Sequence, residues 1–353
     1  MKTQKYRVIG VMSGTSLDGI DLCEVEFKLK KNQWSFYILK AKTQPYPQKW
    51  LKILSSAHQL DKVQLEKTDS EYTDYLAGVI SEFMQSSDEI DLICSHGHTI
   101  LHQPDDGITY QIGNLPKLAK QVGKALVCDF RTADVKLGGQ GAPLVPLGDR
   151  MLFSEYDYCI NIGGFVNISF ENKGHRKAFD ICPANKALNF YASKRGYDYD
   201  DKGQLASKGN LQSDLFKHLN QLEFYSKQPP KSLGIEWLEA QLLPVVEKFD
   251  CSIEDKLHTL CNHMAFQISR VIQNKGSKIL ITGGGAYNDF LLNCLKQYSK
   301  SSIVIIPEQK IVEYKEAVIF GLLGVLKYRN EVNVLSSVTG AIHDHSSGLI
   351  YLP

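Results

Sequence analysis

The residues best suited to chemistry stand together near the N-terminus, in the segment GVMSGTSLDGID at positions 10–21. Gly14 and Gly19 adopt positive φ at little cost, and three hydroxyl residues accompany them. Consecutive backbone N–H groups in such a turn form a concave anion site that suits phosphate oxygens. Asp18 and Asp21 would repel a bare phosphate, so the pattern favours a nucleotide bound together with a divalent cation. An ordinary glycine-rich hairpin is the alternative.

The flanking residues predict the elements that must position this turn. The runs at 6–12 and 20–29 are rich in Val, Ile, Phe and Tyr, which is typical of two strands joined by a tight turn. The same pattern returns at 157–162 and 165–170, around Gly163–Gly164. Two copies of one supersecondary unit, one in each half, predict duplicated domains, with coincidence as the alternative.

Two further segments place polar or glycine residues at the ends of expected strands. Asp180 follows one strand and precedes a helix over 186–195, where a lone carboxylate stabilises the helix N-terminus. A strand over 277–282 opens into Gly283–Gly285, a triplet that lets the backbone approach a flat ligand closely. The triplet does not fit GxGxxG, and the chain contains no GxxxxGK[ST], so neither a Rossmann site nor a P-loop is expected.

Three histidines, His96, His98 and His102, follow an expected strand over 90–94. Ligands separated by one residue fit a strand, so a metallohydrolase is one hypothesis. No carboxylate or cysteine stands at a recognisable ligand spacing from them. We favour a ligand-binding loop at the C-terminal end of this strand, where α/β sheets bind their ligands.

Three more charged residues are candidates for ligand contacts. Asp129 and Arg131 close the next expected strand, where they either form an ion pair with one another or contact a ligand. Glu316 begins a helix expected over 316–328, where it either hydrogen-bonds a polar ligand or lies on the solvated surface.

Composition limits the class of protein. The chain has 353 residues, which suggests two domains. Its formal net charge is +1, so no polybasic surface indicates nucleic acid or a membrane as a partner. The eight cysteines form no CxxC pair, and neither a signal peptide nor a membrane-spanning run is found. These features predict a cytoplasmic protein.

The segment at 10–21 resembles the signature of the anhydro-N-acetylmuramic acid kinases, which belong to the large fold group of hexokinase, Hsp70 and actin. Further blocks that resemble this family follow in the family's order along nearly the whole chain. They are SHGHT at 95–99, QIG at 111–113, DFR at 129–131, GGQGAPLVP at 138–146, NIGGFVN at 161–167, FD at 179–180, GGGA at 283–286, EA at 316–317 and SSVTG at 336–340.

The resemblance implies an α/β fold of two RNase H-like domains, which are duplicated mixed-sheet units around a central nucleotide and sugar cleft. Domain I would comprise residues 1–132 with 333–353, and domain II residues 133–332. The implied activity is the ATP-dependent hydrolytic opening of 1,6-anhydro-N-acetylmuramic acid, a small anhydro amino sugar, with phosphorylation of O6. The products would be ADP and N-acetylmuramic acid 6-phosphate, within cell-wall sugar recycling. ATP and Mg2+ would be needed, and a homodimer is implied.

The resemblance also implies roles for individual residues. Asp180 matches the catalytic base, and Asp18 would hold Mg2+. Residues that match sugar contacts are His96, Asp129, Arg131 and Glu316. Residues that match ATP contacts are Gly14, Thr15, Ser16, Leu17, Asp18, Gly19, Ile20, Asp21, Gly163, Gly164, Asn167, Gly283, Gly284, Gly285 and Asn288.

The chain departs from the family's pattern beside the expected base. The family usually reads Phe-Asp-Thr-Gly-Pro-Gly-Asn where this chain reads FDICPAN at 179–185, so Cys182 and Ala184 replace two glycines. If either backbone required positive φ, the change would cost roughly 1–3 kcal/mol. The loop at 231–236 also lacks the family's usual Thr and Arg. Sugar preference is therefore less firmly predicted than the reaction class.

A nucleotide-switched ATPase of the same broad fold, related to Hsp70 or actin and without sugar kinase activity, is the main rival. Strict dependence of ATP turnover on a small sugar would separate the two classes.

Overall fold

The computed structural model describes residues 3–14, 17–87 and 89–353. The chain divides into two compact units. Unit 1 comprises residues 1–153 and 314–353, and unit 2 comprises residues 154–313. Each unit is described separately below.

Unit 1 is built on a seven-stranded sheet. Its strands, in spatial order, are β3 (Gln33–Gln44), β2 (Ile20–Lys30), β1 (Gln4–Ser13), β4 (Leu92–Gln103), β6 (Ala125–Cys128) and β12 (Leu349–Tyr351), with β5 (Ile108–Ile112) paired to β4. The first three strands are antiparallel neighbours, whereas β1, β4 and β6 run parallel. The strand–turn–strand pattern predicted at the N-terminus is therefore the β1–β2 hairpin.

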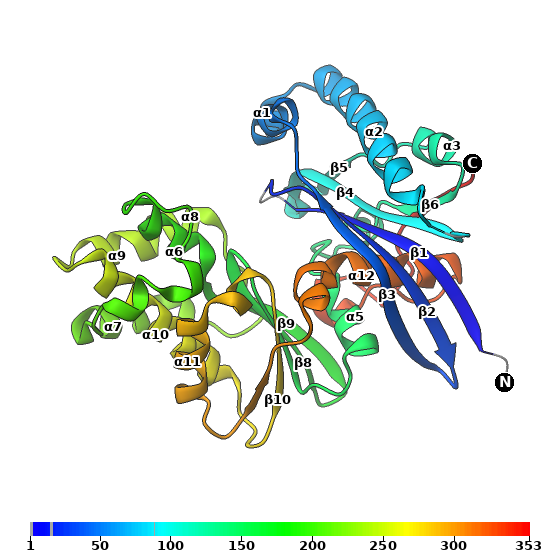
Figure 1. Ribbon diagram of the computed structural model, residues 1–353. Coiled ribbons are helices and arrows are strands. Elements are labelled where there is room, and N and C mark those ends of the chain that lie inside the picture. The colour runs from blue at the N-terminus through cyan, green and yellow to red at the C-terminus, as the bar shows by residue number, and fades with distance from the viewer. Residues whose placement is uncertain (1–2, 15–16, 88) are drawn as a thin grey trace. The chain divides into compact units, whose positions relative to one another are not determined.

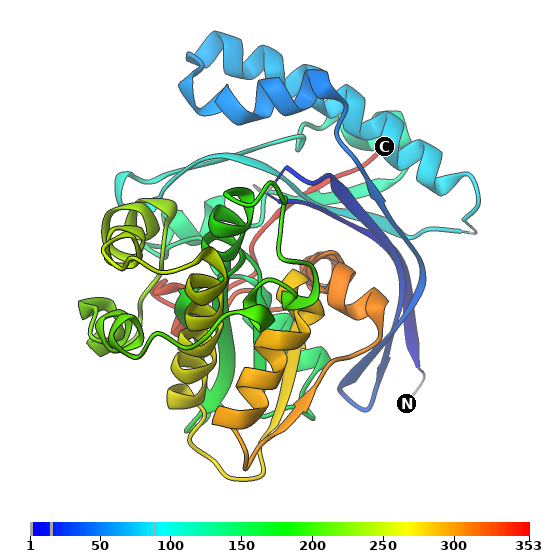
Figure 2. The same ribbon diagram turned by 60° about the vertical axis from the view of Figure 1, so that its left-hand side comes forward.

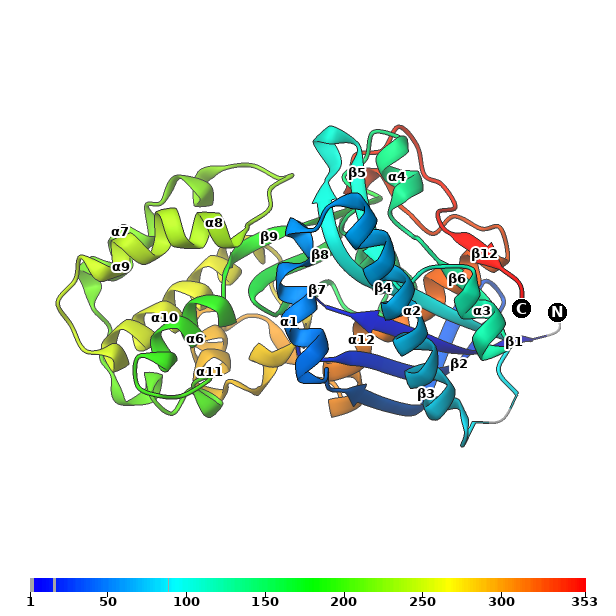
Figure 3. The ribbon, with the colours of Figure 1, turned by 90° about the horizontal axis from the view of Figure 1, so that it is seen from above.

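Helices cover both faces of this sheet, as Figures 1 and 3 show. Successive residues of β1 point to opposite faces of the sheet. Ile9 packs in the core with α1 (Gln48–Ser56) and α2 (Lys62–Met84). Gly10 instead faces α12 (Gln309–Tyr328), where a Cβ would lie only 1.9 Å from the carbonyl oxygen of Ala317. Glycine is required there because the helix crosses the strand at close range. The remaining helices of this unit are α3 (Lys117–Val122), α4 (Thr132–Lys136), α5 (Val145–Leu152), α13 (Ser336–Thr339), η1 (Ala57–Gln59) and η2 (Pro104–Asp106).

Unit 2 repeats the same sheet topology with five strands. Their spatial order is β9 (His175–Pro183), β8 (Phe165–Asn172), β7 (Tyr158–Ile162), β10 (Lys278–Thr282) and β11 (Ile303–Ile305). Again the first three are antiparallel and the last three parallel. The α/β class with duplicated mixed sheets, expected from the sequence, is confirmed.

The core of unit 2 joins its sheet to three longer helices, α6 (Asn185–Ser193), α10 (Ile253–Val271) and α11 (Asp289–Tyr298). Figures 1 and 2 show these helices beside the strands of this unit. The shorter helical segments are η3 (Asp201–Gly203), η4 (Ala206–Lys208), α7 (Ser213–Asn220), η5 (Glu223–Ser226), α8 (Ile235–Trp237), η6 (Leu238–Leu242), α9 (Leu243–Glu247) and η7 (Gly284–Tyr287).

The division between the units falls at 153/154 and 313/314, whereas the sequence-based boundaries were 132/133 and 332/333. Helix α5 belongs to unit 1 because Asp149 and Lys315 form a buried ion pair with an N–O distance of 3.1 Å. In addition, a Cβ on Gly148 would come within 2.5 Å of the Ile319 side chain. Both contacts hold α5 against α12.

One local prediction was wrong. The histidine segment was expected to be a loop, but residues 95–103 continue strand β4, because β5 pairs with this extension in an antiparallel ladder. Among the described residues, no helix has the length and apolar character needed to span a membrane.

Candidate functional site

In unit 1, the candidate phosphate turn connects β1 to β2. Thr15 and Ser16 lie outside the described residues. The carbonyl of Gly14 accepts a hydrogen bond from the Leu17 amide at 3.3 Å, which closes the turn, and Leu17 adopts φ 65°. Asp18 is exposed, whereas Ile20 is fully buried at the start of β2.

A buried polar network holds the β1 end of this turn. Ser13 Oγ lies 2.8 Å from Nδ1 of His98 and is also hydrogen-bonded to the hydroxyl of Tyr46. The hydroxyls of Tyr46 and Tyr72 lie 2.6 Å apart. Burial lowers the pKa of His98 to about 4, so its imidazole is neutral at physiological pH. The network positions the turn through neutral hydrogen bonds.

The carboxylates of the turn suit a magnesium ion that is shared with nucleotide phosphates. Mg2+ usually keeps several waters and takes only one or two protein carboxylates. Asp18 is exposed and able to serve in this way, and Asp21 is held by a 2.6 Å hydrogen bond from the Thr43 hydroxyl. Within the described part of the chain, no group of three or more His, Cys, Asp or Glu residues could hold a metal ion by itself. The three histidines of β4 therefore form no metal centre, and the metallohydrolase hypothesis loses its site.

His96 and Arg131 form a second polar group in unit 1. Nδ1 of His96 donates to the carbonyl of Gly97 at 2.9 Å, so Nε2 is free to accept from Nε of Arg131, also at 2.9 Å. Nη1 of Arg131 donates to the carbonyl of Gly141 at 2.7 Å. Burial lowers the pKa of Arg131 to about 10, although the charges of Glu316 and Asp134 oppose this shift. The guanidinium therefore stays charged, and Nη2 makes no hydrogen bond within residues 3–14, 17–87 and 89–353.

Glu316 lies within electrostatic reach of this arginine. Burial raises the pKa of Glu316, while the charges of Lys315 and Arg131 lower it. Asp129 takes a different position, because its Oδ1 accepts from the Thr132 hydroxyl at 2.6 Å at the start of α4. Asp129 and Arg131 form no ion pair in the described chain, so one of the two sequence-based alternatives is wrong. Of the predicted sugar contacts, the structure groups His96, Arg131 and Glu316.

In unit 2, the turn at Gly163–Gly164 joins β7 to β8 and supports the start of α6. The amides of Ala184 and Lys186 donate to the Gly164 carbonyl, at 2.9 and 3.2 Å, and that of Asn185 donates to the Gly163 carbonyl at 3.1 Å. A Cβ on Gly164 would come 2.9 Å from Cγ of Lys186, whose side chain lies over the turn. The backbone amides at the start of α6 are thus already hydrogen-bonded within the chain. A ligand at this place would therefore contact the Gly163–Gly164 turn rather than the N-terminus of the helix.

Asp180 stands in β9 next to this turn. A β-bulge in the β8–β9 ladder pairs Val166 with Cys182 and Asn167 with Asp180, leaving Ile181 as the extra residue. Bulges re-aim the neighbouring side chain and are frequent beside active sites. The bulge buries Ile181 and Cys182 and leaves Asp180 half-buried, opposite the exposed Asn167.

The loop after residue 230 fixes the orientation of the Asp180 carboxylate. Oδ2 accepts from the Leu233 amide at 2.8 Å, and the Asp180 amide donates to the Lys231 carbonyl at 3.0 Å. Burial raises the pKa of Asp180, and the Leu233 hydrogen bond opposes this shift. Oδ1 makes no hydrogen bond within the described residues. The result is an oriented carboxylate with one oxygen available and a basicity above that of an ordinary aspartate.

The two departures from the family's glycines carry no left-handed backbone. Neither Cys182 nor Ala184 is among the residues with positive φ, and Ala184 has φ −132°. Both side chains are fully buried in the core of unit 2. Burial also raises the pKa of the Cys182 thiol, so this cysteine is not a thiolate nucleophile. Cys182 therefore fills space beside Asp180.

The glycine triplet passes close to the end of β7. Gly283 has φ 81°, and a Cβ on Gly285 would come 2.1 Å from the Ile162 side chain. The side-chain nitrogen Nδ2 of Asn185 would lie 3.4 Å from a Cβ on Gly284 and donates to the Ile162 carbonyl. The triplet and the Gly163–Gly164 turn are therefore neighbours. Asn288, predicted to contact ATP, accepts from the Leu291 amide at 2.9 Å and caps α11.

Sequence reasoning missed Asn161 and Asn185 as members of this site. Asn161 Oδ1 lies 3.4 Å from the Thr282 hydroxyl and would be 2.5 Å from a Cβ on Gly283, so it links the two turns. For Asn161, the available signal was its position as a polar residue in the apolar run at 157–162, just before the Gly163–Gly164 pair.

Comparison with known proteins gives the family. A family model described as "Anhydro-N-acetylmuramic acid kinase" matches residues 6–353. The protein of that name from Nitrosospira multiformis is 32% identical over 377 aligned residues, which cover 99% of this chain and 100% of the relative. The chain belongs to the anhydro-N-acetylmuramic acid kinase family. The Coxiella burnetii protein of the same name is 33% identical, with 98% of both chains covered.

Among solved structures, component A of (R)-2-hydroxyglutaryl-CoA dehydratase from Acidaminococcus fermentans is similar with a TM-score of 0.43 and 13% identity. The alignment covers 92% of this chain and 99% of that one. Membership of the kinase family, inferred above from the motif blocks, is confirmed by the sequence comparisons. The roles assigned to single residues stay predictions.

Proposed function

We propose that this protein uses ATP to open 1,6-anhydro-N-acetylmuramic acid by hydrolysis and to phosphorylate the released O6. The products are ADP and N-acetylmuramic acid 6-phosphate. The observation that carries the proposal is the state of Asp180 in a chain that matches the kinase family over residues 6–353. Its carboxylate is oriented by the Leu233 amide, has one oxygen available and has a raised pKa.

The proposed chemistry needs one base and one acceptor. Asp180 takes a proton from water, and the resulting hydroxide oxygen attacks the anomeric carbon. The bond between this carbon and O6 breaks, and O6 takes the γ-phosphoryl group from ATP. The water proton ends on Asp180 and then passes to solvent. A raised pKa supports this role because a more basic carboxylate accepts the proton more readily.

Arg131 is the proposed contact for the acidic part of the sugar. N-acetylmuramic acid carries a carboxylate, and a guanidinium binds a carboxylate through charge-assisted hydrogen bonds. Nη2 of Arg131 is available for this contact, while Nε and Nη1 are fixed by His96 and Gly141. Glu316 is proposed to accept hydrogen bonds from sugar hydroxyls.

The glycine turns are the proposed ATP contacts, namely residues 14–21, Gly163–Gly164 and Gly283–Gly285. When bound, Mg2+ would neutralise charge on the phosphates, and Asp18 is the residue proposed to hold it. We also assign the protein to the cytoplasm, since its eight cysteines form no disulfide within the described residues, as is usual in a reducing compartment. A homodimer is part of the same proposal on family grounds.

Mass spectrometry after incubation with ATP, Mg2+ and the anhydro sugar tests the function. The expected product carries one water and one phosphoryl group more than the substrate. In 18O-labelled water, the label should appear on the sugar and not in the phosphoryl group, because the transferred group is attached through O6. Release of ADP without any phosphorylated sugar would instead support the rival nucleotide-switched ATPase.

A further inference from the structure

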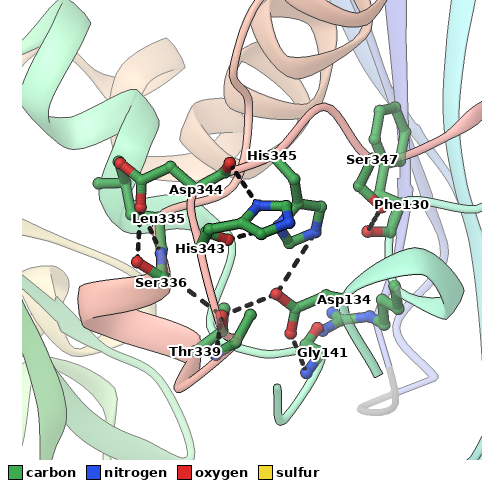
Figure 4. Close-up of polar contacts among 12 residues, drawn as sticks. Phe130, Asp134, Gly141, Leu335, Ser336, Thr339, His343, Asp344, His345 and Ser347 are labelled. Atoms are coloured by element: carbon green, nitrogen blue, oxygen red, sulfur yellow. Dashed lines mark hydrogen bonds and ion pairs between the residues drawn. The ribbon is translucent and has the colours of Figure 1, made fainter. Parts of the chain in front are cut away.

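Asp134 is a fully buried carboxylate that the proposed chemistry does not use. It lies in α4, and its Oδ2 accepts from the Gly141 amide at 2.7 Å. Oδ1 accepts from the Thr339 hydroxyl at 2.7 Å and lies 3.5 Å from Nε2 of His345 (Figure 4). A buried carboxylate with several donors is costly to disturb, because each lost partner leaves charge unpaired.

The first of these contacts connects Asp134 to Arg131. Gly141 donates its amide to Asp134 and accepts Nη1 of Arg131 on its carbonyl. Its φ is 66°, so the residue holds a turn that other residues adopt with strain. Gly139 brings the carboxylate close to the same turn, since a Cβ there would lie 2.2 Å from Asp134 Oδ2. The position of the Gly141 carbonyl, and with it the arginine, depends on Asp134.

The other contacts bring in the C-terminal segment at 334–347. Thr339 and Asp134 are 205 positions apart in sequence, and the Thr339 carbonyl also accepts from the Gln140 amide at 2.8 Å. The Ile342 amide donates to the Leu137 carbonyl at 3.1 Å. This segment therefore holds the turn at 137–141 through two backbone hydrogen bonds, and Asp134 through one side-chain hydrogen bond.

We propose that Asp134 and Thr339 are positioning residues for Arg131. Asp134 fixes the Gly141 backbone, Thr339 holds the Asp134 carboxylate in place, and Gly141 then fixes Nη1 of the arginine. Nη2 is thereby aimed at the carboxylate of the sugar. The inference rests on the proposed function, because it assumes that Arg131 binds the acidic sugar.

Kinetics of full-length variants test this proposal. Thr339→Val removes the hydroxyl and keeps the shape, and it should raise KM for the anhydro sugar by about 3- to 30-fold, the range expected for a coupled network. KM for ATP should stay at the wild-type value. Asp134→Asn should also raise KM for the sugar. Thr339→Ser should keep the wild-type KM for the sugar, because serine retains the hydroxyl donor. Calorimetric titration with the sugar alone should show the same order of affinities.

A matched control lies in the same helix. The Ser336 hydroxyl donates to Asp344 at 2.7 Å, away from Asp134 (Figure 4). Ser336→Ala should therefore lower stability slightly and leave KM for the sugar unchanged. If folded Thr339→Val and Asp134→Asn both keep the wild-type KM and affinity for the sugar, the positioning role is overturned, even if they unfold at lower temperature. If the wild type neither binds nor converts the sugar, the proposed function falls, and this inference falls with it.

Discussion

The carboxylate of Asp180 is both partly buried and held in one orientation. Burial raises its pKa, yet a single backbone donor, the Leu233 amide, keeps it oriented. The bulge at Ile181 produces this state, because it buries the next two side chains and leaves Asp180 at the margin of the core. A base of this kind is expected to cost stability and to gain reactivity.

Asp180→Asn separates these two effects. Product formation should fall by about 10²–10⁴, the range for a positioned general base. Burial raises the folded-state pKa above the unfolded one, so the ionised carboxylate destabilises the fold above the folded pKa, and this cost vanishes below the unfolded pKa. At pH 7 the amide should therefore leave the melting temperature unchanged or raise it. The rate of product formation and the melting temperature are measured on one preparation of the variant.

A folded Asp180→Asn protein with near wild-type release of phosphorylated sugar would remove Asp180 from the mechanism. The pH dependence of the rate is a second test. Because the pKa of Asp180 is raised, the wild-type rate should begin to decline at a higher pH than it would with an ordinary aspartate as base.

Asp18 tests the magnesium assignment at the same scale. Asp18→Asn removes the charge of an exposed side chain, so the fold should be unaffected. Turnover that depends on Mg2+ should fall by about tenfold or more, in line with the loss of about 1.4 kcal/mol or more of charge stabilisation. The affinity for ATP in the absence of metal, measured by titration calorimetry, should change little. Equal losses in both measurements would contradict a metal role.

The sequence predicted these two aspartates because each stands in a short motif with its neighbours. It could not predict what orients Asp180, since Leu233 is 53 positions away and contributes only its backbone amide. The same holds for Asp134 and Thr339, which meet only through the tertiary fold. Contacts made by backbone groups, or between segments that are distant along the chain, produce no local pattern in the sequence and cannot be predicted from it.

At the scale of elements, the end of β1 and the extension of β4 depend on each other. The extension places His98 beside Ser13, and the two tyrosines, Tyr46 and Tyr72, complete the buried network at the β1 end of the turn. Sequence periodicity predicted the β1–β2 hairpin, because apolar residues flank the turn on both sides. It did not predict the extension of β4, since His96, Gly97 and His98 are all buried and therefore lack the alternation of a half-buried strand.

The neutral His98 predicts how the fold responds to acid. Its folded-state pKa is about 4 against an ordinary value of 6.5, so the unfolded chain binds a proton that the folded one does not. Stability therefore falls as pH drops from about 6.5 towards 4. For this buried group, the loss between pH 7 and 5 is about 2 kcal/mol. His98→Asn should lose that much less over the same interval in urea unfolding.

Replacement of the exposed His343 by Asn serves as the matched control, and it should leave the pH dependence of unfolding at the wild-type slope. The buried His263, whose pKa burial lowers to about 3, should add to the acid sensitivity in the same direction. A His98→Asn protein that loses as much stability as the wild type between pH 7 and 5 would show that His98 is not a buried neutral group.

At the scale of the whole molecule, the sequence predicted that a strand, a glycine turn and a second strand recur in the two halves of the chain. Each unit carries an antiparallel trio joined to parallel strands, and each has a glycine turn after its first strand. The limits of the units were harder to predict, because α5 and α12 associate through the buried Asp149–Lys315 pair rather than through any linker in the sequence. The duplication therefore gives each unit its own glycine turn.

Coupling between ATP and sugar is the property that such a chain should show as a whole. In the proposed reaction, O6 becomes a free acceptor only after water has opened the anhydro bond with Asp180 as base, so hydrolysis of ATP alone has no positioned acceptor. We expect ADP release to be about 10²-fold or more slower without the sugar, because a water in its place is not held in line with the γ-phosphoryl group. A coupled ADP assay with and without the anhydro sugar measures this ratio. N-acetylmuramic acid, which lacks the 1,6 bond, is the matched control and should stimulate release far less, since its O6 is not freed beside Asp180. Steady ADP release that ignores both sugars would mean that the chain is a nucleotide-switched ATPase.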